Sequence, residues 1–125
     1  MRATFGLLAM SLLVACGQPV RGEKVDGAYY IIAADDPEDR HLSYDVGGGG
    51  IGLIEETVTG VGHDSRYITV ERRPRTPPGP LEYYYIDRTQ DRPADPPRVI
   101  EGPFDATAFA AEQSRLGLPE LKPVH

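Results

Sequence analysis

Residues 51–72, IGLIEETVTGVGHDSRYITVER, form the stretch that decides the fold. Two segments rich in apolar and β-branched residues, 51–61 and 66–72, lie on either side of Gly62-His63-Asp64-Ser65. Glycine, aspartate and serine favour tight turns, and β-branched residues favour strands. The stretch therefore predicts a β-hairpin.

The first strand of this hairpin has an irregular apolar pattern. Ile54 and Val58 share one face, whereas Val61 falls on the other. We expect a β-bulge near Gly60, because one extra residue would bring Val61 inward.

The rest of the chain supplies further strands and one helix. Asp105 is a suitable N-cap, Gly117 a suitable stop, and Phe109 and Leu116 share a stripe of the helix between them. The fold class predicted is α+β, a small antiparallel β-meander of five or six strands with one C-terminal α-helix packed on the sheet. The other expected strands are residues 28–34, 41–46, 81–87 and 98–101.

The N-terminal residues have the pattern of a signal peptide. Residues 5–14 are about ten uncharged, mostly apolar residues, fewer than the roughly 20 that a membrane-spanning helix needs. Leu13-Val14-Ala15-Cys16 resembles a bacterial lipobox. The resemblance implies cleavage between Ala15 and Cys16 and lipid attachment to the Cys16 thiol. The alternative is an ordinary secretory signal with an incidental cysteine.

These features predict the organisation of the chain. We expect a signal peptide at 1–15, a flexible tether at 16–26, a single β-rich domain at 27–121 and a tail at 122–125. A tether of about ten residues reaches about 33 Å at full extension. Gly17 stands where aspartate acts as an inner-membrane retention signal, so the resemblance implies a cell-envelope location, at the outer membrane facing the periplasm if the organism is diderm.

Charge and cysteine content exclude some classes of protein. The 19 Asp and Glu outnumber the 13 Lys and Arg, for a net charge of −6, which disfavours nucleic acid as a partner. Cys16 is the only cysteine, so the domain has no internal disulfide and depends on its hydrophobic core.

The second half resembles a family of small bacterial lipoproteins with a domain of unknown function. The residues that carry this resemblance are the strand-like segments 66–70 (RYITV) and 84–87 (YYID), Glu101-Gly102-Pro103-Phe104, and Leu116-Gly117-Leu118-Pro119 at the end of the helix. The resemblance implies a secreted, lipid-anchored domain and no particular activity.

Motifs that suggest chemistry are better explained as turns. Gly47, Gly49 and Gly52 match G-x-G-x-x-G, but two glutamates and a β-branched segment follow where a phosphate-binding helix would begin. His63-Asp64-Ser65 are adjacent in a tight turn, where they are poorly placed to form a catalytic triad.

The possible metal ligands are equally unconvincing. The acidic residues 35–39 lack the spacing of a calcium loop, and His41, His63 and His125 are scattered. We therefore assign no catalytic, cofactor-binding or metal-binding residues, and no cofactor.

A partner surface is the remaining possibility. Arg73 and Arg75 flank Pro74 at the start of a stiff loop, and Tyr84 would point outward if Tyr83 and Tyr85 faced the core.

The leading functional hypothesis is a lipid-anchored envelope lipoprotein, a non-catalytic binding or structural module whose partner is an envelope protein or a cell-wall component. The alternative is an inhibitor of a periplasmic or host enzyme, with the loop 74–80 entering a cleft. A lower alternative is an unrecognised hydrolase that uses His63 with Asp64 or the carboxylates of 35–39.

Overall fold

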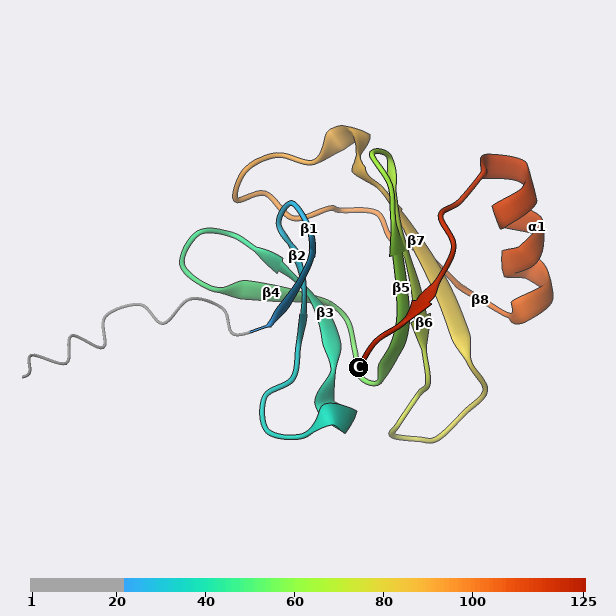
Figure 1. Cartoon of the computed structure of the whole chain (residues 1–125), viewed down its shortest axis with the longest axis horizontal. Helices are drawn as coiled ribbons and strands as arrows, with labels where there is room; N and C mark the ends of the chain where they lie inside the picture. The colour runs from blue at the N-terminus through green and yellow to red at the C-terminus, as the bar shows by residue number, and fades with distance from the viewer. Residues whose placement is uncertain (1–21) are drawn as a thin grey trace, which may run out of the picture.

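The computed structural model describes residues 22–125 (Figure 1). The expected signal peptide, the cleavage site at Ala15, the lipid attachment at Cys16 and the first part of the expected tether lie outside the described residues.

In this part of the chain, two antiparallel sheets have the strand orders β1-β2-β3-β4 and β8-β7-β6-β5-β9. The first sheet consists of β1 (Glu23–Asp26), β2 (Tyr29–Ile32), β3 (His41–Asp45) and β4 (Gly50–Ile54). The second consists of β5 (Val58–His63), β6 (Tyr67–Arg72), β7 (Glu82–Asp87), β8 (Glu101–Phe104) and β9 (Lys122–Pro123). The helical elements are α1 (Ala106–Leu116) and the 3₁₀ turns η1 (Pro37–Asp39) and η2 (Arg88–Gln90).

The predicted α+β class, with antiparallel strands and one C-terminal helix, is confirmed. The strands are more numerous than expected and form two sheets, because the segment predicted as one strand over 51–61 is divided. β4 ends at Ile54 and β5 begins at Val58 in the other sheet. Thr57 secures this corner: its hydroxyl donates to the carbonyl of Glu38 at 2.6 Å, and its amide donates to the carbonyl of Arg73 at 2.9 Å.

The predicted hairpin is formed by β5 and β6, with a register shift between Val58 and Gly60. The expected bulge is therefore confirmed. His63 belongs to β5, so the turn is shorter than predicted. Asp64 stabilises it, since its carboxylate accepts hydrogen bonds from the amides of Arg66 at 2.8 Å and Tyr67 at 2.6 Å.

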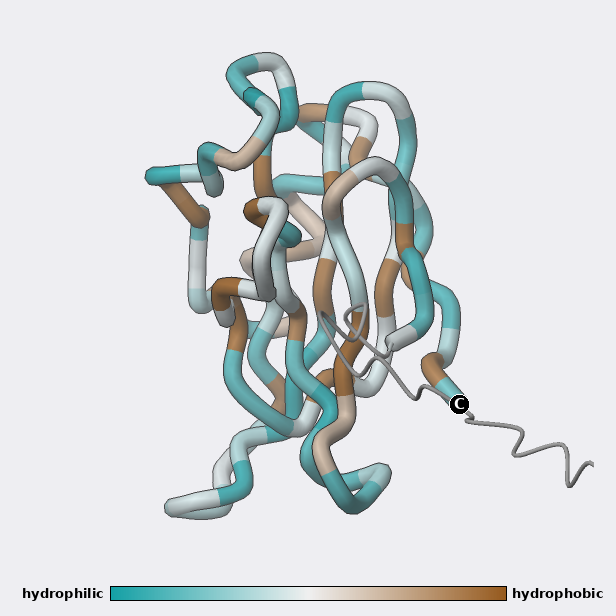
Figure 2. The backbone as a smooth tube through the Cα atoms, turned by 90° about the vertical axis from the view of Figure 1, so that its left-hand side faces the viewer, coloured by the Kyte–Doolittle hydropathy of each residue, from teal (hydrophilic) through white to brown (hydrophobic). Residues whose placement is uncertain are grey.

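The second sheet lies between the first sheet and α1 (Figure 1), and a hydrophobic layer covers each of its faces. The first layer fills the space between the sheets and is formed by Tyr29, Ile31, Leu42, Tyr44, Ile54, Val58, Ile68, Val70 and Ile86. The other lies under α1 and is formed by Tyr67, Tyr85, Phe109 and Leu118. Figure 2 shows the hydrophobic segments within the strands and mostly hydrophilic loops beyond their ends.

The C-terminal helix has the predicted ends and the predicted contact with the sheet. The Asp105 carboxylate accepts a hydrogen bond from the amide of Ala108 at 2.7 Å, and Gly117 takes the left-handed conformation with φ of 65°. The Phe109 ring stacks on Tyr83 with 5.0 Å between centroids. Leu116 packs on the edge of the same cluster.

Three expected boundaries need correction. Residues 23–26 of the expected tether form β1 and pair with β2, and residues 122–123 of the expected tail form β9 and pair with β5. The strand expected over 98–101 begins only at Glu101. The charged sequences of β1 and β9 carry no apolar alternation, because both strands are short and lie at or near the surface.

The C-terminal segment packs so closely on β5 that only glycine fits at position 62. A Cβ on Gly62 would lie 2.3 Å from the backbone oxygen of Glu120 and 2.5 Å from the hydroxyl oxygen of Thr69. We expect Gly62→Ala to lower the free energy of unfolding by about 1–3 kcal/mol, measured by urea denaturation of the full chain.

Gly48→Ala is the matched control, because a Cβ there meets nothing within 4 Å. Its unfolding free energy should change by less than about 0.5 kcal/mol. Equal stability of the two variants would contradict the close packing of residues 118–123 on β5.

Candidate functional site

The two arginines expected to contact a partner are paired within the domain. Arg73 Nη2 lies 3.0 Å from Glu38 Oε2, and Arg75 Nη1 lies 2.5 Å from Asp39 Oδ1. The basic residues beside Pro74 and the acidic turn η1 therefore neutralise one another. The inhibitor hypothesis gains no support from this loop, whose cations already have partners.

Tyr84 also differs from the expectation. Its ring is half-buried against the core between the sheets, and its hydroxyl donates to Glu82 Oε2 at 2.5 Å. The same carboxylate binds Arg72 Nη1 at 2.8 Å. Tyr84 does not point outward, because the second sheet is covered on both faces: Tyr83 and Tyr85 face α1 while Tyr84 faces the other sheet.

His63 and Asp64 do not form a catalytic pair. The Asp64 carboxylate is held by the amides of its own turn, as described above. His63 Nδ1 lies instead 3.6 Å from Asp26 Oδ2, on β1. The predicted turn is confirmed from Asp64 onward, whereas His63 belongs to β5. Within residues 22–125, no hydrogen bond or ion pair joins His63 to the Asp64 carboxylate named in the hydrolase hypothesis.

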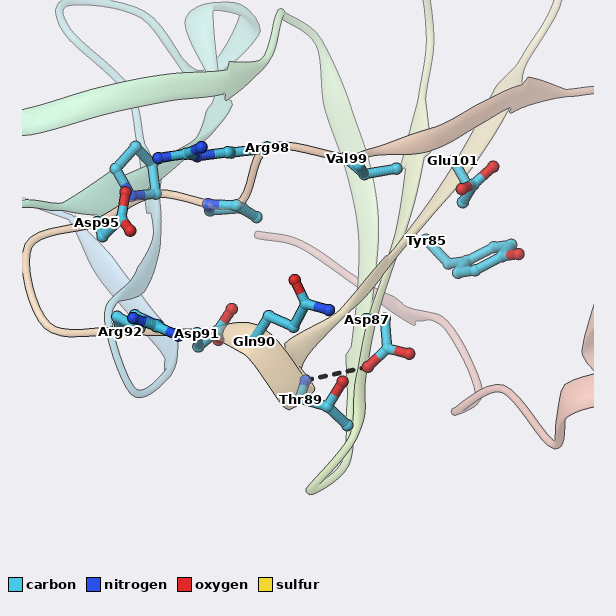
Figure 3. Close-up of a pocket in the computed structure, with 12 residues that line it drawn as sticks. Tyr85, Asp87, Thr89, Gln90, Asp91, Arg92, Asp95, Arg98, Val99 and Glu101 are labelled. Atoms are coloured by element: carbon cyan, nitrogen blue, oxygen red, sulfur yellow. Dashed lines mark hydrogen bonds between the residues drawn. The ribbon is translucent and has the colours of Figure 1, made fainter.

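The connection between β7 and β8 forms a cavity of about 520 Å³, which we call the loop pocket (Figure 3). Its walls come from η2, from the proline-rich residues 91–98 and from the facing parts of β7 and β8. The argument below depends on Asp91, Arg92, Asp95, Arg98, Val99 and Glu101, all of which line it.

Two buried tyrosines of the first sheet hold the loop pocket in position. The Tyr29 hydroxyl donates to Asp91 Oδ1 at 2.9 Å, and the Tyr44 hydroxyl donates to the backbone oxygen of Arg92 at 3.0 Å. The two rings pack edge to face with 5.0 Å between centroids. Burial, followed by the charge of Asp91, raises the pKa of Tyr29 well above its usual range, so its hydroxyl remains a donor.

Arg88 joins the loop pocket to the other end of the chain. Its Nη1 lies 2.6 Å from both Asp26 Oδ2 and the backbone oxygen of Asp64, and its Nε lies 3.7 Å from Asp91 Oδ2. The guanidinium also lies over the Tyr29 ring, 5.6 Å from its centroid. One side chain thus connects β1, the β5–β6 turn and η2.

The loop pocket gathers several charged side chains that form no ion pair within residues 22–125. Within residues 22–125, the arginines paired with carboxylates are Arg66, Arg72, Arg73, Arg75, Arg88 and Arg115. Arg92 and Arg98 form no such pair in this part of the chain, and neither does Glu101. All three line the loop pocket. Sequence analysis missed them, because isolated charges in a proline-rich loop give no recognisable pattern.

Comparisons with protein-family models, curated proteins and solved structures gave no match. Among residues 22–125, no helix has the length and hydropathy to cross a membrane. Over the same residues, no three His, Cys, Asp or Glu side chains lie close enough together to hold a metal ion.

The tyrosine contact with Asp91 can be tested by removing one hydroxyl. Tyr29→Phe should lower the free energy of unfolding by about 1–3 kcal/mol, because a buried hydrogen bond to a carboxylate is lost. It should also speed amide hydrogen exchange in residues 91–95. Tyr30→Phe is the control, since the Tyr30 hydroxyl forms no hydrogen bond within residues 22–125. Similar exchange rates in the two variants would show that Tyr29 does not hold the loop.

The Asp26–Arg88 pair predicts a pH dependence. The hydrogen bond from Arg88, reinforced by its charge, lowers the pKa of Asp26 below the ordinary value of 3.8. The pair therefore stabilises the fold above about pH 4, and this contribution is lost as the pH falls through the lower pKa of the folded state.

Asp26→Asn should have a flatter dependence of unfolding free energy on pH between about pH 4 and pH 2. Asp35→Asn is the control, because Asp35 has no ion pair in the described residues. Unchanged slope in Asp26→Asn, measured by urea denaturation across this range, would contradict the role of the pair.

Proposed function

We propose that this chain is a lipid-anchored lipoprotein of the bacterial cell envelope that acts as a non-catalytic binding module, with the loop pocket as its ligand site. The observation that carries the binding role is the set of unpaired charges, Arg92, Arg98 and Glu101, around one cavity. Its volume of about 520 Å³ falls within the range of about 300–1,000 Å³ that is usual for small-ligand sites.

The anchoring role is supported by the N-terminal sequence pattern that ends at Cys16. Since β1 begins at Glu23, the segment from Cys16 to Gly22 is about seven residues long and reaches about 25 Å at full extension. This tether is shorter than the one expected from sequence. Under the proposal, the domain works close to the membrane surface.

The loop pocket lies at the end of β1 that is remote from the anchor. The chain enters β1 at Glu23, whereas Arg88 contacts Asp26, where β1 ends.

The proposal can be tested in cells with a photoreactive residue at position 99 or position 81. Val99 is 65% exposed and lines the loop pocket, whereas Leu81 is 42% exposed and lies outside it. We expect a covalent adduct of defined mass from position 99 and a weaker one or none from position 81. We also expect the protein in the membrane fraction, and its loss from that fraction in Cys16→Ala.

Lipid anchoring and ligand binding in the loop pocket can be contradicted separately. Membrane association that survives Cys16→Ala would contradict lipid anchoring. Identical products from positions 99 and 81, or no product from either, would contradict the loop pocket as the ligand site.

A further inference from the structure

The charges of the loop pocket are unevenly distributed between its two ends. Figure 3 shows Arg92 and Arg98 at one end, near Asp95, and Glu101 with Tyr85 at the other. The carboxylates of Asp87 and Asp91 also line the pocket, but Asp87 pairs with Arg66 and Asp91 with Arg88. The carboxylate of Asp95 offsets one of the two arginines, so this end keeps an excess of one positive charge, and the other end keeps the negative charge of Glu101.

The chain limits the distance between the backbone positions of Arg98 and Glu101. Arg98 and Glu101 are three residues apart, so their Cα atoms are separated by at most about 10 Å. Glu101 is fixed in β8, where it pairs in register with Tyr85 on β7. The arginine and glutamate side chains extend beyond their Cα atoms, so the charged groups can lie farther apart than this, at a separation that an extended peptide of three or slightly more residues spans.

Hydrogen bonds within the folded domain fix the backbone at the cationic end in the absence of a ligand. The backbone oxygen of Arg92 accepts the Tyr44 hydroxyl, and Asp95 donates its amide to the same oxygen at 3.1 Å. Within this turn Pro93 restricts the backbone, and Ala94 has φ of 60°, a left-handed conformation that is unfavourable for residues other than glycine. Such a conformation persists only where the surrounding contacts impose it.

From this geometry we infer that the loop pocket binds a short peptide with both termini free. The guanidinium groups of Arg92 and Arg98 bind its carboxylate, and the Glu101 carboxylate binds its ammonium group. Guanidinium groups can bind carboxylates through paired, charge-assisted hydrogen bonds. Val99 lies between the two ends and offers an apolar contact to a small side chain. This inference rests on the proposed binding role and names the ligand class.

The test is calorimetric titration of the full chain in detergent micelles with trialanine, N-acetyl-trialanine and trialanine amide. We expect trialanine to bind, and each blocked peptide to bind about tenfold more weakly or worse, because one charge-assisted contact is removed. Absence of trialanine binding, or equal binding of all three peptides, would overturn the inference.

Two variants test which residue binds the carboxylate of the peptide and which binds its ammonium group. In Arg98→Gln, trialanine should bind about as weakly as its amide, so that the acid and the amide become nearly equivalent. In Glu101→Gln, the free and N-acetylated peptides should become nearly equivalent. Arg73→Gln, which lies outside the loop pocket, should keep the wild-type preference. Preferences that are the same in all three variants would exclude these contacts.

Failure of the inference is distinguishable from failure of the proposed function. An adduct from position 99 in cells, together with no binding of trialanine, would leave the binding module standing and remove the peptide as its ligand. Circular dichroism spectra and urea midpoints matching the wild type establish that the variants are folded. Arg98 and Glu101 are exposed and form no ion pair within residues 22–125, so we expect both measurements of Arg98→Gln and Glu101→Gln to match those of the wild type.

Discussion

The burial of the second sheet on both faces is the constraint on which the rest of the structure depends. Successive side chains of β6 and β7 point into different hydrophobic layers: Ile68 and Ile86 into the layer between the sheets, Tyr67 and Tyr85 into the layer under α1. A sheet with two apolar faces needs a cover on each side. The first sheet supplies one cover and α1, with the C-terminal segment, supplies the other. Charged groups consequently lie mainly at the strand ends and in the connecting loops, whereas the buried Thr69 in the middle of β6 donates its hydroxyl to the backbone oxygen of Pro119 at 3.1 Å.

Arg88 illustrates how the fold accommodates a charged side chain close to the core. Its side chain is only 14% exposed, and a guanidinium at that depth needs carboxylate and carbonyl partners. It finds them at Asp26 and Asp64, which are distant in sequence, and at Asp91, which lies at the end of its own 3₁₀ turn. The same contacts fix the start of the connection between β7 and β8. The position of the loop pocket is therefore set by the way the domain satisfies one poorly solvated cation, together with the hydroxyl groups of Tyr29 and Tyr44.

The features that sequence predicted are those with local causes. The β5–β6 hairpin, its bulge near Gly60 and the capped helix α1 each follow from residues within a few positions of one another. The corner at Thr57 was missed because its hydrogen bonds go to Glu38 and Arg73, and nothing in the surrounding sequence interrupts the strand pattern. β1 and β9 were missed because they are short, charged strands whose pairing is supplied by their neighbours. Nothing of the loop pocket was predicted, since its tyrosine donors lie more than 40 residues from their acceptors.

The fate of the arginines shows why clustered charge in a sequence is a poor guide to a binding surface. Arg73 and Arg75 are adjacent in sequence to no acid, yet the fold brings Glu38 and Asp39 to them. Arg92 and Asp95 lie in one turn that a backbone hydrogen bond closes, yet their side chains form no ion pair within residues 22–125, and Pro93, Pro96 and Pro97 restrict the backbone around them. A flexible loop would form ion pairs between its own side chains and so stabilise itself. In a stiff loop the charges stay available for ion pairs with a ligand. Binding then costs less conformational entropy, because the loop is already ordered in the folded protein. Rigidity is thus the physical reason for regarding these particular charges as functional.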